Sequence, residues 1–141
     1  PVPDISTVEA FKQTLLNAQS IAYSASASGT YLSNELFPRL GVAEQIKGKA
    51  TKIYSERVGA VVLRGDAEIG FQQVSELLPF KELVFVGPLP DEVQQRVFFS
   101  AGVAVGSHDP EAARHLIRFL SAPAAAAIVR STGMEPAAAK R

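Results

Sequence analysis

Short apolar stretches alternate with segments of helical periodicity over the first two thirds of the chain. The helical segments have apolar residues every three or four positions, and short loops connect them to the apolar stretches. Because parallel strands need a crossover connection, this alternation favours a mainly parallel sheet flanked by helices. We therefore predict an α/β fold in which small ligands bind at the carboxyl ends of the strands. The predicted strands are Ile21–Tyr23, Ala50–Tyr54, Ile69–Gln73 and Leu83–Val86.

The last third of the chain has a different pattern. Its long apolar segment, Val97–Val105, predicts a strand. Asp109-Pro110-Glu111 predicts a helix start, because Asp is a good cap, Pro fits the first helical position and Glu favours the first turn. An Ala-rich helix is predicted to follow over Ser121–Ser131. The predicted buried face of the first helix consists of Ala112, Leu116, Ile117 and Leu120.

Composition excludes several classes of partner and chemistry. Fourteen basic and fourteen acidic residues cancel, so the net charge indicates neither nucleic acid nor an anionic membrane as a partner. No apolar run approaches the roughly 20 residues that span a bilayer, so we predict no membrane span. The chain has no Cys, and its two histidines, His108 and His115, lack metal-ligand spacing. We therefore predict no metal and no cofactor.

Motifs for catalysis are absent from the sequence. No Gly-x-Ser-x-Gly elbow occurs, and Ser26-Ala27-Ser28-Gly29 lacks the Gly-Lys-Ser/Thr ending of a P-loop. The acidic residues Asp66 and Glu68 are predicted to lie on a solvated edge. These residues give no positive case for catalysis, and we predict that the chain is not an enzyme.

The stretch Ser20–Leu32 predicts a short strand, a hydroxyl-rich loop and a helix start. Free backbone N–H groups, small side chains and the helix dipole can together hold an anion there without a basic residue. Ser and Gly at the same positions also suit a simple turn with a helix cap. The residues alone leave both interpretations open.

Several motifs in fixed order give the chain a family resemblance. These motifs are Asp4-Ile5-Ser6, Ile21-Ala22-Tyr23, Ser28-Gly29-Thr30-Tyr31, Arg64-Gly65-Asp66-Ala67-Glu68-Ile69-Gly70-Phe71, Ser100-Ala101-Gly102-Val103-Ala104, Pro110-Glu111-Ala112-Ala113 and Phe119-Leu120-Ser121-Ala122-Pro123-Ala124-Ala125. By their order and spacing, Val2–Pro136 resembles the C-terminal two-thirds of bacterial extracellular solute-binding proteins of the molybdate-binding type, the capture component of ABC importers.

This resemblance implies a fold of two lobes, of the type II periplasmic-binding-protein kind, that close on a small oxyanion. Residues 4–90 would form the ligand-binding lobe, which is the second lobe of the family fold, and residues 91–141 would return to the incomplete first lobe. The implied ligand-binding positions are Ser26, Ser28, Gly29, Ser55 and Gln73. Of these, Ser28 and Ser55 would provide N–H groups at helix starts. Gln73 stands where the family has a tyrosine, which leaves molybdate, another oxyanion or a carboxylate open as the ligand.

The implied biology is periplasmic capture of a small oxyanion, with the permease of an ABC importer as partner. Family members begin with a further segment, so we expect Val97–Arg141 to expose an apolar patch. The chain is then either a piece of a longer product or a dimer joined through its C-terminal segment. An alternative function is the effector-sensing domain of a transcription regulator with the same architecture. An enzyme of that architecture would be marked by a titratable pair facing the cleft.

Overall fold

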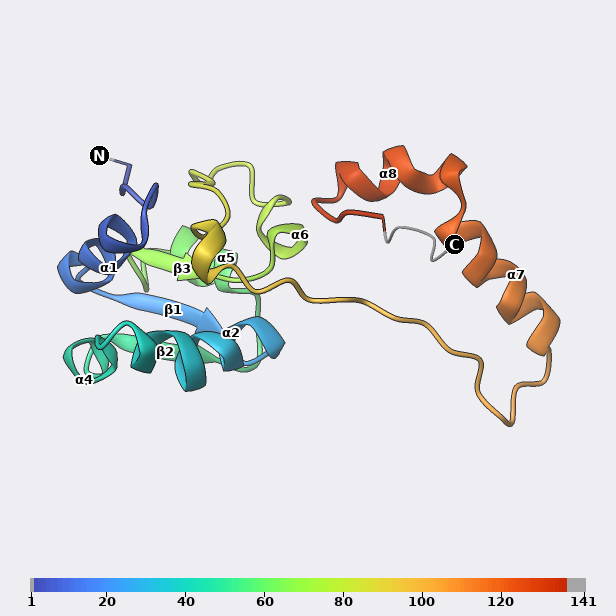
Figure 1. Cartoon of the computed structure of the whole chain (residues 1–141), viewed down its shortest axis with the longest axis horizontal. Coiled ribbons are helices and arrows are strands. Elements are labelled where there is room, and N and C mark those ends of the chain that lie inside the picture. Colours follow the sequence, from blue (N-terminus) through green and yellow to red (C-terminus); the bar gives the residue numbers. More distant parts are fainter. Residues whose placement is uncertain (1, 137–141) are drawn as a thin grey trace. The chain divides into compact units, whose positions relative to one another are not determined.

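The computed structural model describes residues 2–136, which form two compact units that divide between Val97 and Phe98. The first unit contains the three strands and most of the helices, and the second contains the helices of the last third (Figure 1). The predicted lobes, residues 4–90 and 91–141, remain a prediction. Residues 137–141 of the predicted return segment lie outside the described residues.

The sheet of the first unit has the order β2-β1-β3, and all pairs are parallel. The central strand β1 (Ile21–Ser24) lies between β2 (Ala50–Ile53) and β3 (Ile69–Phe71) (Figure 1). Parallel neighbours require a crossover, and each of these connections carries helix, as the alternating pattern predicts. The predicted α/β fold with a parallel sheet flanked by helices is therefore confirmed.

The longest helical run of the first unit follows β1. It begins as α2 (Ala27–Tyr31), continues as the π-helical turn η1 (Leu32–Leu36) and ends as α3 (Phe37–Arg39). Within it the Phe37 N–H donates to the Leu32 carbonyl, five residues back. The other helices of this unit are α1 (Val8–Asn17), α4 (Ala43–Ile46), α5 (Val58–Leu63), α6 (Val74–Leu77) and the 3₁₀ turn η2 (Asp91–Val93).

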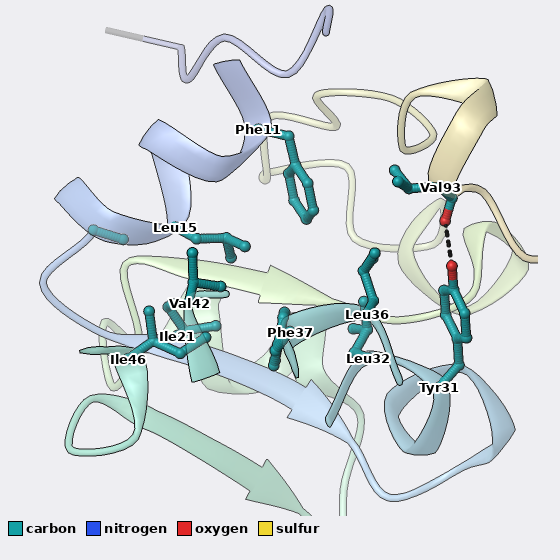
Figure 2. Close-up of a cluster of buried hydrophobic side chains, with 11 residues drawn as sticks. Phe11, Leu15, Ile21, Tyr31, Leu32, Leu36, Phe37, Val42, Ile46 and Val93 are labelled. Atoms are coloured by element: carbon teal, nitrogen blue, oxygen red, sulfur yellow. Dashed lines mark hydrogen bonds between the residues drawn. The ribbon is translucent and has the colours of Figure 1, made fainter. Parts of the chain in front are cut away.

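Neighbouring residues of β1 face opposite sides of the sheet and enter two separate clusters. Ile21 packs into the larger cluster, formed with α1, the run from α2 to α3, and α4 (Figure 2). Ala22 packs on the other side against Val58 and Val61 of α5. Full burial of a large apolar side chain contributes about 1.5–3 kcal/mol, so these two layers hold the strand ends in place. The large side chains that are almost wholly buried are Phe11, Leu15, Ile21, Leu36, Ile46, Val42 and Val58.

Two predicted strands do not form. Residues 84–86 of the predicted strand Leu83–Val86 lie in a loop, and the predicted strand Val97–Val105 is irregular chain. Both segments have the apolar residues of a strand, but a strand also needs a neighbouring edge for its N–H and C=O groups. Among residues 2–136, the sheet pairs only β1, β2 and β3, so these predictions are wrong.

The second unit consists of α7 (Pro110–Ser121), the 3₁₀ turn η3 (Pro123–Ala125) and α8 (Ala126–Ser131). The predicted helix start is confirmed, since Asp109 Oδ1 accepts the Ala112 N–H at 2.9 Å. The predicted burial is wrong, because Ala112, Leu116 and Leu120 are exposed and Ile117 is only half-buried. Within residues 2–136 no single helix is long and apolar enough to cross a membrane, although α7 together with η3 and α8, bent by 57°, reaches that length and composition.

Candidate functional site

The carboxyl ends of the three strands meet at one edge of the sheet. Ser24, the last residue of β1, lies opposite Ile53 of β2, and Tyr23 lies opposite Phe71 of β3. The Ala25 N–H donates to the Ile53 carbonyl at 2.9 Å and extends this alignment by one residue. The loops after β1, β2 and β3 therefore leave the sheet together. Open α/β sheets bind ligands at this edge.

Three serine hydroxyls form a cluster where β1 passes into α2. Ser24 Oγ lies 2.7 Å from Ser26 Oγ and 3.3 Å from Ser28 Oγ, and the last two are 3.2 Å apart. Ser24 is buried, Ser28 is half-buried and Ser26 is exposed. Each hydroxyl has one proton and two lone pairs. Ser26 and Ser28 can therefore both donate to a ligand while Ser24 donates its proton to one of them.

The cluster surrounds the N-terminus of the helical run. Ser26 is the N-cap residue, and its side chain makes no capping hydrogen bond to the helix. Its carbonyl accepts the Thr30 N–H, so the amides of Ala27, Ser28 and Gly29 precede the first helical bond. These amides carry the partial positive charge of the helix dipole. The structure therefore puts the predicted residues Ser26, Ser28 and Gly29 together at one helix start.

Gly29 is fixed by a close approach of two backbones. A Cβ atom at this position would lie 1.6 Å from the carbonyl oxygen of Ser24. Only glycine therefore lets α2 pack this tightly on the end of β1. The residue has a structural reason to be glycine, and the same contact brings the free amides to the edge of the sheet.

The prediction that Ser55 begins a helix is wrong. Helix α5 begins at Val58 with Arg57 as its N-cap residue, and Ser55 lies exposed in the loop after β2. The Val58 N–H donates to Gln72 Oε1 at 2.8 Å, so a side chain from the end of β3 caps this helix. Ser55 remains at the carboxyl edge by its place after β2, but its amide is not part of a helix N-terminus.

Gln73 lies at the same edge, two residues after the end of β3. It is the half-buried N-cap residue of α6, and its carbonyl accepts the amides of Glu76 and Leu77. No hydrogen bond of its side chain occurs within the described residues, unlike that of Gln72. The predicted residue thus offers a carboxamide at the edge, next to one that already has a structural partner.

An ion-pair network supports the loop between β2 and α5. Arg64 donates to both oxygens of Glu56, at 2.7 and 2.9 Å, and to Asp66 Oδ2 at 3.0 Å. The hydrogen bonds from Arg64 lower the pKa of Glu56 below its usual value. Both carboxylates are exposed, so the prediction of a solvated edge at Asp66 fits its surroundings. Glu68 accepts the Gln19 N–H at 2.6 Å and so links the segment before β3 to the segment before β1.

Two residues of the site were missed in the sequence. Ser24 belongs to the hydroxyl cluster, and its signal is the alternation Ser-x-Ser-x-Ser that starts on the last strand residue. Gln72 caps α5 from the loop after β3, and no local pattern indicates such a contact. Within residues 2–136 no group of three or more metal-ligating side chains gathers, and the prediction of no metal remains a prediction.

Comparison with known proteins decides the family. The profile of the bacterial extracellular solute-binding proteins matches residues 1–135. The chain belongs to this family. A relative from a Pseudomonas species, named aconitate isomerase, is 47% identical over 140 residues, which are 99% of this chain and 53% of that protein. The chain therefore spans about half the length of this relative. No solved structure matches the chain significantly.

These findings correct one prediction and limit others. The prediction that the chain is not an enzyme is wrong, because a relative this similar along the whole chain is named as an enzyme. The family supports solute binding and a location outside the cytoplasm. It does not distinguish a molybdate-binding branch, and the relative is named for a different small molecule.

Proposed function

We propose that the chain forms part of an isomerase that acts on a small polycarboxylate of the aconitate type. The observation that carries this proposal is the 47% identity to the relative named aconitate isomerase over 99% of the chain. Membership of the solute-binding family supports binding of the substrate at the carboxyl edge of the sheet. Because the chain spans about half of that relative, the activity is proposed for the full-length product of its gene.

The chemistry of such a reaction sets two requirements. Aconitate has a carbon–carbon double bond, three carboxylates and a CH₂ group beside the double bond. Loss of a CH₂ proton and its return to the former vinyl carbon moves the double bond, with no net oxidation or reduction. The protein must therefore bind carboxylates in a fixed orientation and provide an acid–base group.

The serine cluster meets the first requirement for one carboxylate. The amides of Ala27, Ser28 and Gly29 and the hydroxyls of Ser26 and Ser28 are donors grouped at a helix start. A carboxylate accepts several such hydrogen bonds, each contributing about 1.5–3 kcal/mol. Ser55 and Gln73 add a hydroxyl and a carboxamide at the same edge of the sheet.

The direct test is isomerisation by the full-length product. Incubation with cis-aconitate in heavy water, followed by NMR, should show formation of trans-aconitate with deuterium entering the carbon skeleton. Calorimetry should show that the double variant Ser26→Ala/Ser28→Ala binds trans-aconitate at least tenfold more weakly. Ser33→Ala is the matched control, because Ser33 Oγ bonds only to Thr30 and Asn34 within the described residues. A protein that neither isomerises nor binds aconitate contradicts the proposal.

A second candidate is capture of a molybdate-like oxyanion for the permease of an ABC importer. The family and the uncharged donors at the start of α2 favour it, because a tetrahedral oxyanion accepts the same hydrogen bonds as a carboxylate. Calorimetry with molybdate and trans-aconitate separates the two candidates. Tighter binding of molybdate without isomerisation would support capture, and the reverse would support the isomerase.

A further inference from the structure

A cavity of about 370 Å³ that is open to solvent and lined mostly by exposed residues lies beside α2, within the first unit. Its volume falls in the range of small-molecule sites. One wall comes from α2 and η1, and the other comes from residues 95–97, where the chain leaves this unit. The residues that line it are Ala27, Thr30, Tyr31, Glu35, Gln95, Arg96 and Val97.

A buried hydrogen bond anchors the chain just before residues 95–97 to α2. The Tyr31 hydroxyl donates to the Val93 carbonyl at 2.8 Å and accepts a hydrogen bond from Arg39 at 3.1 Å. Val93 itself packs into the main core (Figure 2). The segment that carries Arg96 therefore starts from an anchored position three residues away.

The two charged side chains of the cavity come from different segments of the chain. Glu35 belongs to η1 and Arg96 to the segment of residues 95–97, and both residues are exposed. Neither makes an ion pair within 4.0 Å in the part of the chain that the structure describes. The guanidinium of Arg96 is thus available to a carboxylate, which it can bind through two parallel hydrogen bonds.

The cavity is continuous in sequence with the serine cluster. Ala27 lines the cavity and stands between Ser26 and Ser28 at the start of α2. A ligand with carboxylates on different carbons can place one group at the amides and another in the cavity. An oxyanion with a single central atom has no second group for this purpose.

We propose that this cavity is a second carboxylate subsite, in which Arg96 is the cation and Thr30 an additional hydroxyl donor. The inference rests on the proposed function, because it concerns the same polycarboxylate. The subsite selects polycarboxylates over inorganic oxyanions. Glu35, which lines the same cavity, repels the negative charge of such a ligand and limits its affinity.

The test uses calorimetry on the full-length product with trans-aconitate and with molybdate. Arg96→Gln should weaken binding of trans-aconitate about tenfold or more, and Arg96→Lys should restore part of it. Glu35→Gln should tighten binding of trans-aconitate severalfold, because it removes a like charge. Binding of molybdate should change less than twofold in every variant. Arg130→Gln and Glu44→Gln are charge controls from other ion pairs and should leave both ligands unaffected.

The outcomes separate this inference from the proposed function. If the unmodified protein binds trans-aconitate and Arg96→Gln binds it equally well, the subsite is wrong and the isomerase proposal stands. If Arg96→Gln weakens trans-aconitate and molybdate equally, Arg96 is not specific to a second carboxylate, and the inference is also wrong. If the unmodified protein binds no polycarboxylate, the proposed function fails, and the inference fails with it. Thermal unfolding of each variant checks that the fold is retained.

Discussion

Large apolar side chains are buried in the first unit of the chain and exposed in the second. In the first unit Phe11 and Leu36 are 0% exposed, and in the second Phe98 is 79% and Phe119 61% exposed. Helix α7 has twelve residues, an Asp cap and an apolar stripe, so its local sequence suffices to specify a helix. Burial needs a second layer of structure in addition. The difference shows that amphipathic pattern and buried core are separate properties of a segment.

The largest test of this difference replaces one Phe in each unit. Phe11 contacts the Phe71 ring edge to face, with centroids 5.8 Å apart, so Phe11→Ala should lower the free energy of unfolding by about 3–5 kcal/mol. Phe119→Ala should change it by less than about 0.5 kcal/mol, because its side chain is already in solvent. Chemical denaturation of both variants measures the two values. Equal losses would mean that Phe119 is buried in the folded protein.

A smaller effect is expected from the glycines. The Cβ of Gly29→Ala would overlap the Ser24 carbonyl, and the forced backbone shift should cost about 1–3 kcal/mol and weaken ligand binding. Gly102→Ala adds a Cβ to open space in the second unit and should be neutral or slightly stabilising. Thermal unfolding and calorimetry compare the pair. Unchanged stability of Gly29→Ala would show that α2 does not pack this closely on β1.

The exposed apolar side chains of the second unit predict self-association of the isolated chain. Monomers rarely expose large contiguous apolar patches, and Phe98, Phe119 and Ile128 are all more than half exposed. The mass from light scattering should therefore rise above 15.0 kDa as the concentration increases. Phe119→Lys should reduce this rise, and Lys47→Gln, on the exposed surface of the first unit, should not. A constant monomeric mass at high concentration would contradict the prediction.

The smallest expected effect is a pH dependence confined to the first unit. Arg64 lowers the pKa of Glu56 in the folded protein, so the unfolded chain binds more protons just below pH 4.5. The stabilisation by Glu56 is present above pH 4.5 and is lost as the pH falls through the lower, folded pKa. Glu56→Gln should therefore lose this part of the acid dependence, and Glu111→Gln in the second unit should keep it. Denaturation midpoints between pH 3 and 7 measure the difference; identical profiles would show that the Glu56 pair contributes nothing.

Local sequence was sufficient for much of the fold. The strands at Ile21, Ala50 and Ile69 begin where apolar residues and turn signals place them, and the Asp109 cap is where its pattern indicates. The strand predicted over Val97–Val105 failed because periodicity describes one chain segment, whereas a strand depends on the edge of another. The same limit applies to the face of α7 that contains Leu116.

The site was predictable where it depends on neighbours in the chain. Ser26, Ser28 and Gly29 lie within four residues, and their proximity follows from the helix start. The start of α5 was misplaced at Ser55 because Gln72, from the distant loop after β3, supplies the cap. The cavity beside α2 contains Glu35 and Arg96, which come from segments about 60 residues apart in the sequence. No rule of sequence spacing relates two such distant residues.

The π-helical turn makes the middle of the long helical run sensitive to residue number as well as to residue type. The buried pairs Tyr31–Leu32 and Leu36–Phe37 recur after five positions, which a π turn aligns and an α-helix does not. Deleting one residue between these pairs would restore a regular α-helix but rotate one end of the run relative to the other. Either the buried side chains would leave the core, or the start of α2 would leave the end of β1. Relatives that keep both the core and the helix start should therefore show neither insertions nor deletions in this turn, even where its exposed residues differ.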